Sequence, residues 1–108
     1  MIKISYRWQD KKEKYFTSIK IQGHANSAPK GKDLICAAVS AIVNGTINFL
    51  QNNYSQFCQI TCDLAEIKIT IDYLHFPNQE LQLCLKMFFF QLKNLADSYP
   101  HHINFVLC

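Results

Sequence analysis

Glycine and proline are scarce in this sequence, with three residues of each among 108. Flexible linkers and low-complexity segments are commonly rich in these residues, so the composition leaves little room for either. The length is that of one ordinary domain, and an apolar share of 49% is enough to form a core. We therefore expect a single domain that spans residues 1–108.

Charge is limited as well. The chain has 11 basic and 8 acidic residues, which give a net charge of +3, and much of the basic charge falls at residues 11–14 and 30–32. Nucleic-acid binders usually carry a denser basic stripe. Direct binding of nucleic acid is therefore not expected.

No hydrophobic run is long enough to cross a membrane. The longest, "LICAAVSAIV" at residues 34–43, has about half the length that a membrane span needs. The first residues, "MIKISYRWQD", contain no apolar signal segment. These features predict a cytoplasmic protein without a membrane partner.

Cysteine occurs five times, but the odd number and the spacing match no small disulfide scaffold. In the cytoplasm these thiols would stay reduced. Cys58 and Cys62 are four residues apart, whereas zinc sites usually show tighter pairs and more ligands. We expect these two side chains to share one face of a strand and to pack there. No metal site and no cofactor are predicted.

Alternating apolar and polar residues predict strands at residues 2–8 and 15–21, joined as an antiparallel hairpin. In the second strand the alternation places Tyr15 and Thr17 on the same face as Ile19. A second hairpin is predicted from residues 57–62 and 67–73, and a last strand from residues 103–108.

Two segments show helical spacing of apolar residues. The first follows Asp33, a good N-cap residue, and fades after Leu50; the second follows a predicted cap at Asn78. The resulting order, β-β-α-β-β-α-β, predicts an α+β two-layer sandwich in which a mainly antiparallel sheet packs against two helices.

The predicted chemistry lies between the first hairpin and the first helix. Cys36 falls in the first turn of that helix, where unpartnered backbone N–H groups and the macrodipole favour a thiolate. Lys30 and Lys32 favour the same charge state. His24 comes just after a strand, and the loop that follows is long enough to bring its ring to the sulfur.

A nucleophile, a proton carrier and backbone N–H groups in one segment would suit acyl transfer. The thiolate would attack a carbonyl, His24 would protonate the departing amine, and water would release the acyl group. A plainer interpretation stands beside this one, because a buried cysteine often only fills space and a single histidine at a strand end is usually solvated.

A resemblance favours the catalytic interpretation. Residues 23–25, "GHA", a short polar loop, and then "GKDLICAAVSAI" closely resemble the ribosomal-processing cysteine protease (Prp) family of bacteria. The matching positions are Gly23, His24, Ala25, Gly31, Asp33, Leu34, Ile35, Cys36, Ala37, Ala38, Val39, Ser40 and Ala41.

The resemblance implies that His24 and Cys36 are the catalytic pair. It implies as substrate the N-terminal extension of a large-subunit ribosomal protein, the twenty-seventh in that series, cut after an aromatic residue. It also implies a homodimer, which an unusually apolar first helix would suit. The alternative is a non-enzymatic ribosome- or RNA-associated binding module.

Two of the residues near the predicted catalytic pair have more than one possible role. Asp33 would cap the helix, orient His24, or do both, and Gly31 would give the end of the loop its backbone freedom. Ser40 lies four residues after Cys36 and so on the same helix face, where it would contact the substrate or only allow close packing.

Overall fold

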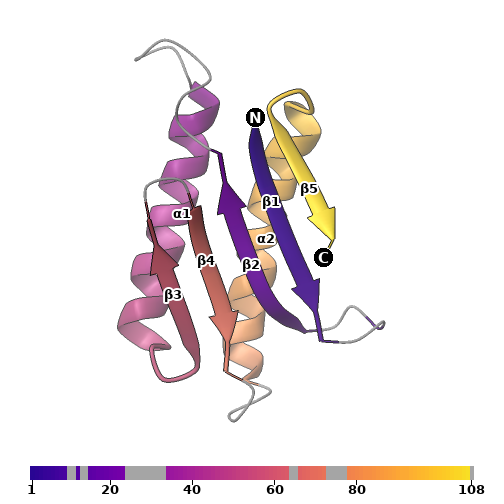
Figure 1. Ribbon diagram of the computed structural model, residues 1–108. Helices are drawn as coiled ribbons and strands as arrows, with labels where there is room; N and C mark the ends of the chain where they lie inside the picture. Colours follow the sequence, from indigo (N-terminus) through magenta and orange to yellow (C-terminus); the bar gives the residue numbers. More distant parts are fainter. Residues whose placement is uncertain (10–11, 13–14, 24–33, 64–65, 73–77, 108) are drawn as a thin grey trace.

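The computed structural model describes residues 1–9, 12, 15–23, 34–63, 66–72 and 78–107. The elements follow the predicted order (Figure 1). In chain order they are β1 (Ile2–Trp8), β2 (Phe16–Gln22), α1 (Leu34–Asn53), β3 (Cys58–Cys62), β4 (Glu66–Ile71), α2 (Gln79–Ser98) and β5 (Ile103–Leu107).

The five strands form one sheet in the order β3-β4-β2-β1-β5. The pairs β1–β2, β2–β4 and β3–β4 are antiparallel, while β5 runs parallel to β1 (Figure 1). The predicted fold class, an α+β sandwich with a mainly antiparallel sheet, is confirmed.

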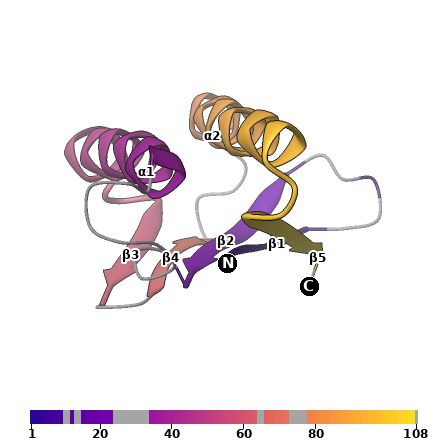
Figure 2. The ribbon, with the colours of Figure 1, turned by 90° about the horizontal axis from the view of Figure 1, so that it is seen from above.

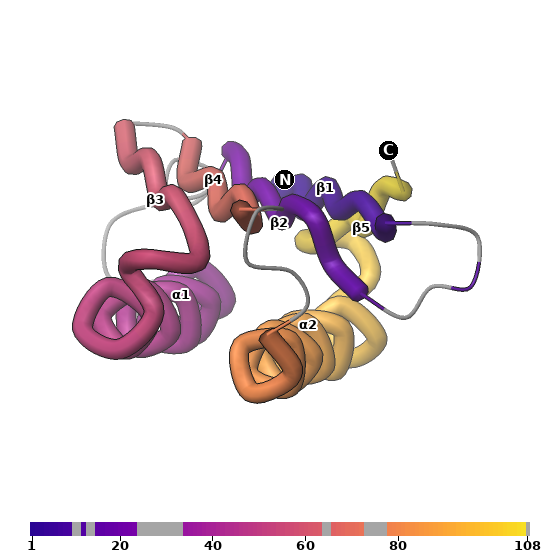
Figure 3. The backbone as a smooth tube through the Cα atoms, turned by 90° about the horizontal axis from the view of Figure 1, so that it is seen from below, coloured from indigo at the N-terminus to yellow at the C-terminus, as the bar shows by residue number. Residues whose placement is uncertain are grey.

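Both helices cover the same face of the sheet, so the molecule has two layers (Figures 2 and 3). Side chains between the layers form the core. Its largest fully buried members come from both layers: Ile4, Phe16, Ile19, Ile21, Val39, Leu50, Ile69, Leu81, Leu85, Phe88 and Leu92.

A buried stripe fixes the rotation of α1 about its own axis. Its buried residues recur at steps of three and four, which places them on one side of a helix. By length and composition α1 would also suit a membrane span, but a single packed stripe is the pattern of a core helix. The buried members are Cys36, Val39, Val43, Ile47 and Leu50.

Helix α2 begins where the sequence predicted it. Asn78 has an extended backbone, and its side-chain oxygen accepts a hydrogen bond of 3.0 Å from the backbone N–H of Leu81. This is the predicted N-cap, which satisfies one of the N–H groups that the helix itself cannot pair.

The predicted alternation of inward and outward side chains in β2 is wrong at its first residue, Phe16. A β-bulge lies opposite Arg7 and Trp8, so Trp8 pairs with Phe16 while Arg7 pairs with Ser18. Phe16 therefore faces the core, where its ring stacks on Trp8 at 4.0 Å between centroids. Thr17 is buried on the side of Ile19, as predicted, and the bulge, which adds one residue to β2, lets Phe16 face the core as well.

Gln82 of α2 supplies hydrogen bonds to the strand backbone at the bulge. Its side-chain amide is buried and forms two hydrogen bonds with the backbone of Phe16, accepting from N–H at 2.8 Å and donating to C=O at 2.9 Å. These bonds supply the pairing that a neighbouring strand would otherwise give, and they tie α2 to β2.

We predict that Gln82→Leu lowers the free energy of unfolding by about 2–4 kcal/mol, because two buried backbone groups lose their partners. Urea unfolding followed by circular dichroism measures the change. The matched control is Gln51→Leu on the exposed part of α1, for which we expect a change within about 0.5 kcal/mol. Equal stability of the two variants would contradict the role given to Gln82.

Candidate functional site

Cys36 is the third residue of α1, as the sequence predicted. The first four backbone N–H groups of a helix have no acceptor within it, and they point out of its N-terminus together with the positive end of the macrodipole. No charged side chain occurs along α1, so the helix itself carries no charge that would oppose this field. The position favours a negative charge on the sulfur or on a substrate oxygen.

The Cys36 side chain heads the buried stripe and keeps 9% of its surface exposed. It therefore points toward the sheet rather than into solvent. The thiol lies at the edge of the core, at the end of the molecule where α1 begins.

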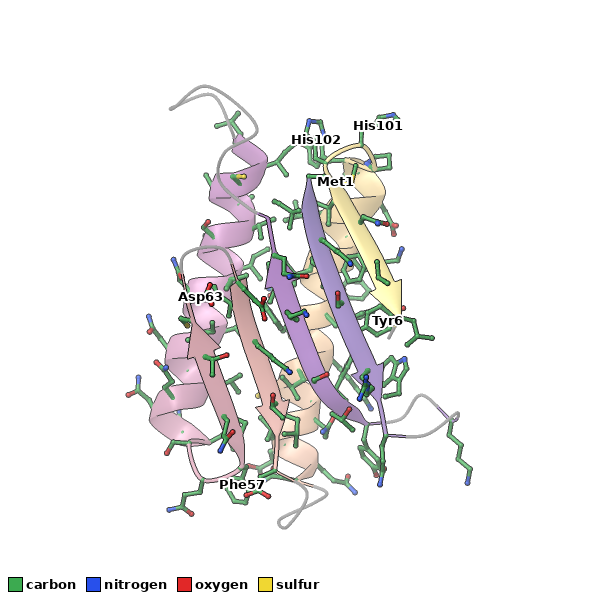
Figure 4. All side chains as sticks on the ribbon, viewed as in Figure 1. Met1, Tyr6, Phe57, Asp63, His101 and His102 are labelled. Atoms are coloured by element: carbon green, nitrogen blue, oxygen red, sulfur yellow. The ribbon has the colours of Figure 1, made fainter. Side chains whose placement is uncertain are left out.

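Gly23 ends β2 at that same end (Figure 1). Its φ is +76°, a conformation that side-chain-bearing residues rarely adopt, and a Cβ atom there would lie 2.7 Å from the carbonyl oxygen of Met1. Figure 4 labels Met1 beside this end of the sheet. Glycine thus lets the chain leave the strand sharply, immediately before His24.

His24, Gly31 and Asp33 lie outside the described residues, as do Lys30 and Lys32. Their predicted roles stay predictions. Of the described residues, Cys36 and Ser40 share one side of α1, Ser40 lines a cavity with Ile21 of β2, and Gly23 follows the last residue of β2.

A small cavity lies between α1, the end of β2 and the start of β4, with a volume of about 160 Å³. A cavity of ~150 Å³ in another protein accepts benzene, so this volume is enough for one large apolar side chain. The walls are mainly aliphatic and the polar groups come from α1. The lining residues are Ile21, Val39, Ser40, Val43, Asn44 and Ile67.

Ser40 and Asn44 follow Cys36 at successive steps of four, so the three residues share one side of α1. Ser40 is half-buried and Asn44 is exposed. Ser40 was predicted from the sequence and Asn44 was not, although the same spacing extended by one turn leads to Asn44. Their amide and hydroxyl groups are suitable for hydrogen bonds to a peptide backbone.

Cys58 and Cys62 face the same side of β3, as predicted, opposite Ile71 and Ile67. Cys58 is buried as expected, but Cys62 is exposed near the end of the strand, so the predicted packing is wrong for Cys62; both are free thiols. Within the part of the chain that the structure describes, no three His, Cys, Asp or Glu side chains are grouped as metal ligands. His101 and His102 are exposed in the turn before β5 (Figure 4).

An α+β fold with a thiol in the first turn of a helix, one turn before a cavity for an apolar side chain, has the components of a cysteine protease. The family model described as "Cysteine protease Prp" matches residues 1–104. The chain therefore belongs to this family and is a cysteine protease. The resemblance seen in the sequence is confirmed.

Two relatives carry the name ribosomal processing cysteine protease Prp. The protein of Mycoplasma pneumoniae is 35% identical over 83 residues, which cover 77% of this chain and 79% of that protein. The protein of Mycoplasma genitalium is 33% identical over 82 residues, covering 76% and 79%.

Solved structures share the fold. The essential ribosomal processing protease Prp of Staphylococcus aureus, in complex with a covalently linked product peptide, matches with a TM-score of 0.85 at 25% identity over 100% of both chains. SMU.848 of Streptococcus mutans matches with a TM-score of 0.75 at 26% identity, covering 99% of this chain and 93% of that chain.

Two other thiols, those of Cys58 and Cys84, have surroundings that favour the protonated form. Burial raises the pKa of Cys58, whose Sγ donates a hydrogen bond of 3.3 Å to the carbonyl oxygen of Tyr54. Burial also raises the pKa of Cys84, and the nearby carboxylate of Glu80 adds to the effect. Both groups are therefore largely protonated at neutral pH, and alkylation requires the thiolate.

We predict that iodoacetamide at pH 7 alkylates Cys36 at least about tenfold faster than Cys58. The two side chains are matched in exposure, at 9% and 7%, so a difference in rate reports ionisation rather than access. Raising the pH from 7 to 9 should accelerate Cys58 and Cys84 more than Cys36, because their raised pKa leaves more thiol to ionise. Quantitative mass spectrometry of each cysteine peptide measures the rates. Equal rates at Cys36 and Cys58 would contradict an activated Cys36.

Proposed function

We propose that this protease removes the N-terminal extension of a large-subunit ribosomal protein, the twenty-seventh in that series, with Cys36 as nucleophile and His24 as general acid and base. The observation that carries the proposal is the place of Cys36 in the first turn of α1, in a chain of the Prp family. The name of its relatives supports a ribosomal substrate. The cytoplasm, where ribosomes assemble, would be its location.

The reaction begins when the Cys36 sulfur attacks the carbonyl carbon of the scissile bond. Negative charge moves to the carbonyl oxygen, and the N–H groups at the start of α1 are suited to stabilise it. The C–N bond then breaks as the His24 imidazolium gives its proton to the leaving amine, which yields a thioester.

Water completes the reaction. His24 takes a proton from water as the water oxygen attacks the thioester, and the C–S bond breaks to expel the Cys36 thiolate. The carboxylic acid product releases its proton to solvent, which restores the thiolate and imidazolium pair. Asp33 would cap α1, orient His24, or do both. No metal or other cofactor enters these steps.

The cavity beside Cys36 gives a basis for substrate choice. Its aliphatic walls, Ile21, Val39, Val43 and Ile67, would hold the aromatic side chain that precedes the cut. Ser40 and Asn44 would hydrogen-bond to the peptide backbone next to it. The volume of about 160 Å³ admits one ring, so this position should discriminate most strongly among substrates.

We predict that Cys36→Ala lowers cleavage of a peptide spanning the extension by at least about 10³-fold, because the nucleophile is removed. His24→Ala should lower it by about 10²–10⁴-fold, the usual contribution of general acid–base catalysis. Chromatography with mass analysis of the products measures both rates.

The matched control is Cys62→Ala, which removes an exposed thiol of β3 and should cleave at the parent rate. A glycine in place of the aromatic residue should also slow the parent enzyme, because the cavity would stay unfilled. Parent-like cleavage by Cys36→Ala or His24→Ala would refute the catalytic pair.

We also propose a homodimer formed through the outer side of the helices. A groove of about 590 Å³ runs between α1 and α2, and none of the described residues that line it is charged. Three exposed apolar side chains of α2 lie at or beside it: Leu83 (68% exposed), Met87 (59%) and Phe90 (67%). Small residues of α1, Ala41 and Gly45, line the opposite wall.

A second copy of the chain fits this surface because it carries both halves of the contact. The apolar side chains of α2 on one copy can enter the groove beside Ala41 and Gly45 on the other, and a twofold axis repeats the contact. Uncharged apolar surface of this kind commonly marks a protein interface.

We predict that Met87→Glu converts the dimer to monomer, because the interface would bury an unpaired carboxylate. Analytical ultracentrifugation measures the state, and Gln51→Glu is the control, since it adds the same charge to α1 outside the groove. A parent chain that sediments as a monomer, or a Met87→Glu variant that stays dimeric, would contradict this interface.

A further inference from the structure

The face of the sheet turned away from the helices is polar and basic. In β1, Ile2 and Ile4 are buried in the core, so Lys3, Ser5 and Arg7 point to the opposite side. Their partners in β2 continue the same face, since Lys3 pairs with Gln22, Ser5 with Lys20, and Arg7 with Ser18. This uncovered face is the one toward the viewer in Figure 1.

Two lysines of this face lie directly opposite each other. Lys20 of β2 pairs with Lys68 of β4. Directly opposed residues have Cβ atoms about 5 Å apart, and like charges in that position destabilise a sheet. The pair therefore does not serve folding, whereas an anion bound between the two ammonium groups would remove the repulsion.

Around this pair the surface forms a shallow hollow of about 130 Å³. Three cations line it, Lys20, Lys68 and Arg7, together with the hydroxyl-bearing Ser5 and Ser18; Tyr6 completes the lining. Ser5 is only 5% exposed, so its side chain forms the floor. Ammonium, guanidinium and hydroxyl groups are the usual donors to phosphate oxygens.

Among the described residues, the acidic groups lie at the margins of this face and not in the hollow. Glu66 sits one cross-strand row away, where its carboxylate accepts a hydrogen bond of 3.3 Å from Gln22. Asp72 follows the end of β4, and Asp63 follows the end of β3. The centre of the sheet therefore has a positive potential that the net charge of the chain does not reveal.

The residues of this face suit an RNA backbone better than an acidic protein as the binding partner. A protein interface needs an apolar centre, but among the described residues that point outward from the strands Val106 of β5 is the large apolar one. Nucleic-acid interfaces are polar and positive. No aromatic ring of the described strands points outward to stack on bases, so phosphate contacts without sequence preference are favoured.

We propose that the hollow formed by Arg7, Lys20 and Lys68 on the uncovered face of the sheet binds the phosphate backbone of RNA. The cavity beside Cys36 lies on the helix side of the sheet, so RNA bound here leaves that cavity open. A protease whose relatives process ribosomal proteins would thereby be held near ribosomal RNA. The site does not depend on the identity of the peptide that is cut.

The test is binding of a labelled single-stranded RNA of mixed sequence, about 20 nucleotides long, measured by fluorescence anisotropy at several salt concentrations. Three phosphate contacts to a single strand predict a slope of log K against log salt of about −2. The double variant Lys20→Gln/Lys68→Gln should weaken binding at low salt about tenfold or more and make the slope less steep by about 1.4.

The matched control is Lys86→Gln/Lys93→Gln, which removes the same charge from α2 on the other layer. It should bind RNA nearly as the parent does, and both double variants should cleave a short peptide at the parent rate. Equal loss of RNA binding in the two variants, or a slope near zero in the parent, would overturn the proposal. Binding of a polyglutamate peptide as tightly as RNA would overturn the choice of RNA.

Discussion

The rotation of α1 about its axis is the constraint on which the site depends. Val39, Val43, Ile47 and Leu50 hold one side of the helix against the sheet, and Cys36 is the first member of the same stripe. A shift of one residue along the helix would turn the thiol by about 100° and expose it on another side. Core packing therefore directs the thiol of Cys36, the nucleophile that we propose, toward the sheet at the end of the molecule where α1 begins.

The packing of both helices on one face of the sheet leaves three separate surfaces. The inner side of α1 joins the core and the cavity beside Cys36. The outer sides of α1 and α2 leave the uncharged groove that we propose for dimerisation. The uncovered face of the sheet holds the basic hollow. A two-layer fold with one bare sheet face can thus keep a peptide, a second copy and an RNA strand apart.

Local patterns in the sequence were sufficient for most elements. Alternation identified β1 and β4 because each buries one face, and Asn78 was found as a cap because its bond to Leu81 spans three residues. Cys36 could be placed at a helix start for the same local reason. The family resemblance added the substrate class, which no spacing of residues reveals.

Structural features that depend on contacts between distant segments could not be predicted from local patterns. The bulge at Phe16 depends on Gln82, which is 66 residues away, and simple alternation gave no sign of it. The cavity beside Cys36 needs Ile21 and Ile67 from two other strands. The pairing of Lys20 with Lys68 depends on a strand order that alternation does not specify. Net charge alone therefore argued against a basic surface.

A crystal structure of the enzyme linked to a substrate-derived peptide through a thiol-reactive carbonyl analogue would test the central claim most directly. We expect one covalent bond, at Cys36 Sγ, with the His24 imidazole within hydrogen-bond reach of the sulfur and the aromatic side chain of the peptide in the cavity lined by Val39 and Val43. A bond at another cysteine, or an imidazole of His24 that stays far from Cys36 in the linked complex, would contradict the account.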